Sequence, residues 1–177
     1  MTAATHAIAT QGLGASTATI AKKAGVSNGS LFVYFDTKVV LLNELFVALK
    51  TEMAESSLVG IPSEEEPREQ MLHVWTQWMR WATASPDKRR AVAQLLVSDD
   101  ITAASHELAN NAFGAMADLL ERSRVGGPME HAPLTFVLTL TNTIAEATID
   151  AVIREPANAE TLTRLAFDAT WRVIAGK

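Results

Sequence analysis

The segment from Ser16 to Lys38 constrains the fold of this chain most strongly, because it places two short helices on either side of one tight turn. It has the sequence STATIAKKAGVSNGSLFVYFDTK. Ser16 is a good N-cap for a helix that continues to Ala24, since its hydroxyl can accept a hydrogen bond from a backbone N–H of the first helical turn. Gly25 is predicted to end this helix, because glycine adopts the left-handed conformation without a steric penalty.

A second helix is predicted to follow at once, from Asn28 to about Phe35, with Ser27 as its N-cap. Leu31 and Phe35 lie four residues apart and give this helix one buried face, and Val26 is expected to point inward at the corner. Two helices joined by such a short turn form a helix-turn-helix, which we place at residues 16–35. In motifs of this kind that bind DNA, the second helix enters the major groove. An ordinary helical corner of a globular protein is the alternative interpretation.

The segment resembles the DNA-binding motif of the TetR family of bacterial transcriptional repressors. The family signature is approximately T-x-x-x-I-A-x-x-A-G-V-S-x-G-x-[LI]-[YF]-x-[HY]-F-x-[ST]-K. The residues of this chain at its defined positions are Ser16, Ile20, Ala21, Ala24, Gly25, Val26, Ser27, Gly29, Leu31, Phe32, Tyr34, Phe35, Thr37 and Lys38. Within the family, the run LFVYF before TK and a tryptophan-bearing helix that ends in W-x-x-x-S-P are most similar to RamR-like repressors, which act in multidrug efflux regulation.

This resemblance implies a set of DNA-contacting residues in and around the second helix. Many family members have tyrosine where this chain has Phe32, and the missing hydroxyl removes a phosphate hydrogen bond worth about 1 kcal/mol. Lys38 stands in the first turn of the next helix, where a positive charge opposes the helix dipole, so a phosphate partner would explain it; a tolerated surface lysine is the alternative. The expected DNA-binding residues are Ser16, Ser27, Asn28, Gly29, Ser30, Phe32, Val33, Tyr34, Thr37 and Lys38.

The net charge of −5 is compatible with DNA binding because the charge is unevenly distributed. Residues 1–50 contain four lysines and two acidic residues, a net charge of +2, which leaves −7 for the remainder. This is typical of a mildly basic DNA-binding segment followed by an acidic body. Proteins of the family usually carry a basic arm before the motif; this chain shows none, so either it dispenses with the arm or the sequence starts inside the natural one.

The remainder of the sequence has helical periodicity without a strand pattern. Helices are predicted over residues 1–11, 37–56, 66–84, 86–96, 102–124, 133–154 and 159–175, in addition to the two of the motif. We therefore expect an all-α protein of about nine helices. It would have an N-terminal three-helix DNA-binding domain over residues 1–50 and a C-terminal helical ligand-binding and dimerisation domain over residues 51–177.

Tryptophans cluster in the predicted helix 66–84, where three of the four in the chain fall within seven residues. A core helix with large anchors is the simple interpretation, and a flat aromatic wall for a planar ligand is the alternative. Polar residues recur along helix 133–154 and could line a cavity opposite that wall, where the carboxylate of Glu146 would suit a cationic ligand. The expected ligand-binding residues are Trp75, Trp78, Met79, Asn142 and Glu146.

The final helix is apolar on two sides and therefore needs two neighbours. Leu165, Ala169 and Val173 mark one side, and Phe167, Trp171 and Ile174 mark the other. We predict a four-helix bundle made of two helices from each of two subunits, which is also how proteins of the TetR family dimerise; burial within a monomer is the alternative. The expected interface residues are Leu138, Ala145, Ile149, Val152, Phe167, Trp171 and Ile174.

The sequence shows no catalytic, metal-binding or nucleotide-binding motif, so we expect no enzyme activity, metal or cofactor. It has no cysteine, and no apolar run approaches the ~20 residues of a membrane span, which predicts a soluble cytoplasmic protein. The resemblance implies a homodimeric repressor that binds a palindromic double-stranded DNA operator and is released by a small, aromatic or hydrophobic inducer. The alternatives are a helical DNA-binding regulator without a small-molecule ligand, and a helical enzyme or carrier.

Overall fold

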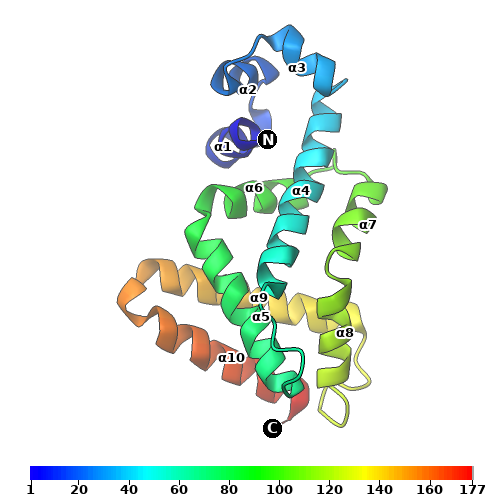
Figure 1. Cartoon of the computed structure of the whole chain (residues 1–177), viewed down its shortest axis with the longest axis vertical. Helices are drawn as coiled ribbons and strands as arrows, with labels where there is room; N and C mark the ends of the chain where they lie inside the picture. Colours follow the sequence, from blue (N-terminus) through cyan, green and yellow to red (C-terminus); the bar gives the residue numbers. More distant parts are fainter. Residues whose placement is uncertain (177) are drawn as a thin grey trace. The chain divides into compact units, whose positions relative to one another are not determined.

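The structure, a computed structural model, describes residues 1–176 and is built from helices (Figure 1). Over this range it contains ten α-helices, two short 3-10 helices at Gly12–Gly14 and Pro156–Asn158, and no strand. The α-helices are α1 (Thr2–Gln11), α2 (Thr17–Ala24), α3 (Asn28–Tyr34), α4 (Lys38–Leu58), α5 (Pro67–Ala84), α6 (Pro86–Leu96), α7 (Ala103–Asn111), α8 (Gly114–Ser123), α9 (Leu134–Arg154) and α10 (Ala159–Ala175).

The all-α prediction is confirmed, but the number of helices is ten because the single helix predicted over residues 102–124 is two helices. The chain turns between α7 and α8, where the backbone N–H of Phe113 donates to the carbonyl of Asn110 over 2.9 Å, and α8 then begins at Gly114. The break changes the face that α7 buries. Leu108, which the uninterrupted pattern places in the core, is 58% exposed.

The described chain forms two compact units. The first comprises Met1–Ala54 and Ser85–Phe113, and the second comprises Glu55–Ala84 and the chain from Gly114 onward. The boundary between Ala54 and Glu55 falls inside α4, so this helix belongs to both units. These units are defined by internal packing; the functional division at residues 1–50 and 51–177 stays a prediction.

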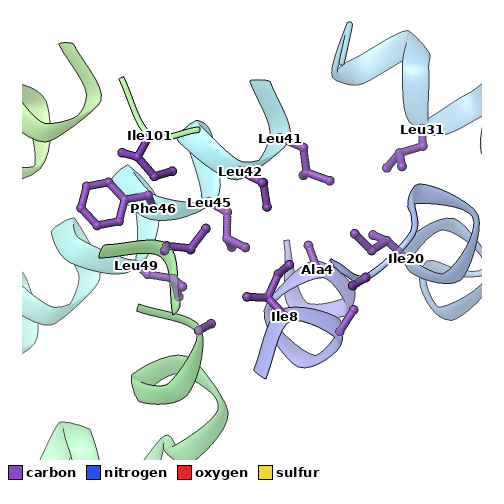
Figure 2. Packing of buried hydrophobic residues seen from close by; sticks show 14 of the residues in the cluster. Ala4, Ile8, Ile20, Leu31, Leu41, Leu42, Leu45, Phe46, Leu49 and Ile101 are labelled. Atoms are coloured by element: carbon purple, nitrogen blue, oxygen red, sulfur yellow. The ribbon is translucent and has the colours of Figure 1, made fainter. Parts of the chain in front are cut away.

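The first unit has one core, which fixes the motif to the helices around it (Figure 2). α1 packs against α2 and α6, and α2 packs against α3. Ile8 of α1, Ile20 of α2 and Leu31 of α3 each bury their side chains in this core, together with a row along α4 that includes Leu42 and Phe46. Burying a side chain of this size stabilises the fold by roughly 1.5–3 kcal/mol. The three helices of the motif region are therefore held mainly by apolar contacts, and a contact of 2.7 Å between His6 and Asp87 also joins α1 to α6.

The second unit is built on α9 and α10, which pack on each other and both on α5. Aromatic residues fill the contact between α5 and α10, where the rings of Trp75 and Phe167 lie 6.4 Å apart and those of Phe167 and Trp171 stack at 6.1 Å. An ion pair closes the same contact, because Arg68 donates from Nη2 to Oδ1 of Asp168 over 2.6 Å. The aromatic residues of α5 thus serve first as core anchors.

Helix α9 is long and apolar enough, by length and composition alone, to cross a membrane. We expected no such segment, because no apolar run approaches about 20 residues. Over 18 residues of α9, however, the aliphatic residues outweigh the threonines and Asn142 that lie between them. One such helix is weak evidence of a membrane span, since a packed helix of a soluble core meets the same criteria. Here α9 packs on α5 and α10.

Candidate functional site

The turn between α2 and α3 follows the sequence prediction. The Ser16 hydroxyl accepts from the Thr19 N–H over 3.1 Å at the start of α2, and Gly25 ends this helix with φ 74° and ψ 23°. Its left-handed conformation lets the N–H of Val26 return to the carbonyl of Ala21 over 3.0 Å. One detail is wrong: Val26 is 43% exposed and does not point into the corner.

Helix α3 is held by one deeply buried side chain and exposes the opposite face. Leu31 is 7% exposed, whereas Val33 and Tyr34 are 80% and 77% exposed. Asn28 and Gly29 are exposed in the first turn, and Phe32 is also exposed. The exposed side chains of Val33 and Tyr34 leave apolar surface on this short helix that a partner could cover. The face that is open to a partner is thus the one predicted to bind DNA.

Several hydroxyls among the predicted DNA-binding residues already have intramolecular partners. Ser27 accepts from the Ser30 N–H over 3.0 Å and caps α3, and the two hydroxyls lie 2.8 Å apart. Thr37 accepts from the Val40 N–H over 3.2 Å, which confirms it as the N-cap of α4. Helix capping therefore explains the side chains of Ser27 and Thr37, and each cap stabilises its helix by about 1 kcal/mol. A hydrogen bond that these hydroxyl oxygens accept from a partner has to use a lone pair that the capping bond leaves free.

Lys38 has a structural partner that the sequence analysis missed. Its Nζ donates to the carbonyl oxygen of Leu13 over 2.6 Å and joins the start of α4 to the 3-10 turn before α2. This bond explains a lysine at a helix N-terminus without a phosphate, although an ammonium has two further N–H donors. Lys22 and Lys23, in the last turn of α2, are exposed and provide the positive charge of the motif itself. The sequence signal that could have identified Lys22 and Lys23 is that the two lysines are adjacent.

The predicted ligand-binding residues do not come together around one cavity. Trp75 is 3% exposed, and its indole N–H donates to the carbonyl of Thr163 over 3.1 Å. Trp78 meets the edge of Trp75, with ring centres 6.1 Å apart. Asn142 and Glu146 lie on an exposed face of α9. Of the five predicted residues, Met79 alone lines the cavity of about 470 Å³ in the second unit. Trp75 is therefore a core residue, as the simple interpretation of the tryptophan cluster predicts.

The predicted dimer residues are largely covered by their own chain. On α9, Ala145 and Ile149 are fully buried and Val152 is 8% exposed; on α10, Phe167, Trp171 and Ile174 are equally enclosed. Leu138 is half-buried against the cluster formed with Leu120 and Val137. A second subunit cannot cover side chains that the first has already buried. The open apolar side chains of these two helices are instead Phe136, Ile153, Leu165 and Val173.

The buried amine of Lys50 on α4 gives stability a pH dependence. Its Nζ lies 4.3 Å from the centre of the Phe113 ring, and burial lowers the pKa of Lys50 below its ordinary 10.5 because desolvation penalises the charged form. The unfolded chain then binds the proton more tightly than the native chain, so the contribution of Lys50 to the unfolding free energy rises as the pH increases toward 10.5. Lys50→Met should abolish this rise.

The measurement for Lys50 is a series of urea unfolding curves at pH 7, 8.5 and 10 for the wild type and the variant. We expect the unfolding free energy of the wild type, relative to that of Lys50→Met, to be larger at pH 10 than at pH 7. Lys23→Met, which replaces an exposed lysine, is the control for simple loss of charge. A difference between the wild type and Lys50→Met that is constant with pH would contradict the assignment.

Comparison with known proteins agrees with this geometry. Residues 1–45 match the family model described as bacterial regulatory proteins, tetR family. A protein from Shewanella sp. PV-4 described as a tetR family transcription regulator has a TM-score of 0.88 at 24% identity, over 98% of this chain and 95% of that chain. A TetR family transcription regulator from Marinobacter aquaeolei VT8 has a TM-score of 0.81 at 20% identity, over 98% and 92%. The transcriptional regulator FadR from Bacillus subtilis, solved in complex with stearoyl-CoA, has a TM-score of 0.70 at 18% identity, over 99% and 96%.

The matched residues 1–45 contain both helices of the motif and the start of α4, whereas the structural likeness extends through the second unit. Residues 1–45 thus match the model of the tetR family, and the described chain as a whole shares its fold with solved structures described as TetR family transcription regulators.

Proposed function

We propose that the protein is a cytoplasmic, ligand-responsive transcriptional repressor that binds a palindromic operator as a homodimer and is released by a small, aromatic or hydrophobic inducer. The observation that supports DNA binding most directly is the open face of α3. Val33 and Tyr34 are almost fully exposed at the end of this helix, and Asn28 is exposed at its start. Base edges in the major groove offer both hydrogen-bonding groups and the apolar thymine methyl, which suits such a mixed surface.

In this proposal, residues 1–50 bind DNA, and residues 51–177 bind the inducer and form the dimer interface. Helix α4 passes from one to the other without a break. An inducer acts by favouring a state of the dimer in which the two recognition helices no longer match successive major grooves, about 34–36 Å apart. The structure of FadR from Bacillus subtilis in complex with stearoyl-CoA supports binding of a small molecule by a protein of this fold. The sequence resemblance favours genes of drug efflux as targets.

Selection of bound duplexes from a random DNA library by the full chain tests the DNA-binding proposal. We expect enrichment of a sequence with two-fold symmetry, and a loss of affinity for it of about tenfold or more in Val33→Ser. Val59→Ser is the matched control, because Val59 is also an exposed valine, 68% accessible, but lies outside the motif. Failure to enrich any sequence would refute the proposed repressor and favour a helical carrier.

The dimer proposal predicts that an exposed apolar residue of α10 is covered by the second subunit. Leu165 is 60% exposed on the described chain. Leu165→Asp would place a charge at this interface without a partner, at a cost of several kcal/mol, and should shift the protein to monomers in light scattering after size-exclusion chromatography. Leu108→Asp, which changes a leucine of similar exposure on α7, should leave the mass unchanged. A monomeric wild type would contradict the proposal directly.

A further inference from the structure

A cavity of about 470 Å³ opens in the second unit between α5, the end of α9 and the beginning of α10. This volume lies within the range of about 300–1,000 Å³ that is usual for small-molecule sites. Apolar side chains form part of its lining, with Met79 and Val152 almost wholly buried. The threonines at positions 76, 83 and 163 add hydroxyls to the wall. The cavity therefore combines an apolar surface with groups that can hydrogen-bond.

Two arginines give the cavity its charge. Among residues 1–176, the guanidinium of Arg80 forms no hydrogen bond or ion pair. Arg164 has one distant partner, Asp168, whose Oδ2 lies 3.8 Å from its Nε, and the other oxygen of Asp168 is already bound by Arg68 at 2.6 Å. Most of the N–H donors of both arginines are thus available. Guanidinium groups are suited to carboxylate, sulfonate and phosphate oxygens because their planar donors can bind two oxygens at once.

The third charged residue of the lining, Glu160, limits the charge of the ligand. Its carboxylate makes no ion pair with either arginine, so the three side chains together carry a net charge of +1. A ligand with one negative charge neutralises this net charge, whereas a multiply charged anion would leave an excess of negative charge in the cavity. A cationic ligand would face both guanidiniums, which is the less favourable arrangement.

We propose that this cavity binds an amphipathic monoanion, with its acidic group at Arg80 and Arg164 and its apolar body against Met79 and Val152. The site differs from the one predicted around Asn142 and Glu146, which lie on an exposed face of α9. Its wall is also connected to the aromatic core, because the carbonyl of Thr163 accepts the indole N–H of Trp75. The inference that this cavity regulates DNA binding rests on the proposed function. The inference that the cavity binds an anion does not depend on it.

The test uses two fluorescent probes with the same aromatic body, the anionic anilinonaphthalene sulfonate and the uncharged phenylnaphthylamine. We expect Arg80→Gln and Arg164→Gln to weaken sulfonate binding about fivefold each, the upper end for an exposed ion pair, and about 25-fold together if the effects add. Glu160→Gln should strengthen sulfonate binding by removing the like charge. Binding of the uncharged probe should be unchanged in all of these variants.

Arg122→Gln is the matched control, because Arg122 is exposed on α8 and does not line the cavity. The proposal is overturned if the sulfonate probe does not bind the wild type, if the Arg80 and Arg164 variants bind it as tightly as Arg122→Gln does, or if the uncharged probe loses affinity equally. The DNA selection is measured separately. Failure to enrich a DNA sequence would refute the proposed repressor but would not affect the anion site. Unchanged sulfonate affinity in the Arg80 and Arg164 variants would refute the anion site but would not affect the proposed DNA binding.

Discussion

Replacing Arg124 with methionine should lower the free energy of unfolding by about 2–4 kcal/mol, because this side chain holds the connection between α8 and α9 together. Arg124 is 8% exposed. Its Nη1 donates to the carbonyls of Met129 and Ala132, both over 2.6 Å. Its Nε and Nη2 form two parallel bonds of 2.8 Å with the carboxylate of Glu121. One side chain thus satisfies two carbonyls of an irregular segment.

The cost of Arg124→Met comes mainly from the two carbonyls, since Glu121 is partly exposed and water can solvate its carboxylate. The Ala132 carbonyl is left without its donor, at a cost of about 1–3 kcal/mol, whereas the Met129 carbonyl loses the charged donor but keeps a bond from the Ala132 N–H over 3.2 Å. The segment has little freedom to move to new partners, because a Cβ added at Gly127 would lie 2.5 Å from the carbonyl oxygen of Ile174 in α10. The segment between α8 and α9 therefore packs closely against the end of α10.

Urea unfolding followed by circular dichroism at fixed protein concentration measures this effect. Arg122→Met, at an exposed residue in the last turn of α8, should change the unfolding free energy by less than about 0.5 kcal/mol. Glu121→Gln should cost less than about 1 kcal/mol, because Arg124 keeps its two carbonyls. If Glu121→Gln costs as much as Arg124→Met, the ion pair and not the carbonyls carries the stability, and the explanation is wrong.

Local signals in the sequence were sufficient for the motif. Ser16 and Ser27 cap helices, and Gly25 turns the chain, through atoms only a few residues away. Such features depend on neighbours along the chain and can be predicted without knowledge of the fold. The bond from Lys38 to the carbonyl of Leu13 spans 25 residues, and nothing in the local pattern indicates it. The same is true of Arg124, whose burial depends on the carbonyls of a later segment.

The second unit shows why a periodic pattern does not identify a surface. The final helix is apolar on two sides, and in the sequence both sides show apolar residues at helical spacing. The structure buries Phe167 and Ile174 against its own chain and leaves Leu165 exposed. Which side faces inward depends on where α5 and α9 lie, and that is set by tertiary packing. The same holds for Asn142 and Glu146, which are exposed on the described chain, since a polar stripe is compatible with either a cavity or solvent.

Gly29→Ala should stabilise the free protein and weaken its binding to the operator, a combination that a purely structural glycine does not produce. Gly29 lies in the first turn of α3, and its backbone is not left-handed. A Cβ added there meets nothing closer than the hydroxyl oxygen of Ser27 at 3.8 Å, an ordinary van der Waals distance. Alanine is favoured over glycine in a helix by roughly 0.5–1 kcal/mol. The fold itself therefore has no need of glycine at this position.

A glycine that the fold does not require is explained if the backbone must approach a partner closely. The proposed partner is the major groove, and a methyl group on the exposed first turn of α3 would separate the helix from the base edges. We expect Gly29→Ala to weaken binding to the selected DNA sequence by about tenfold or more, equivalent to about 1.4 kcal/mol or more. Gly114→Ala is the control, because Gly114 begins α8 with open space around it and should gain stability without any change in DNA affinity. Unchanged DNA affinity in Gly29→Ala, measured by fluorescence anisotropy at fixed salt, would show that the first turn of α3 does not lie against the bases.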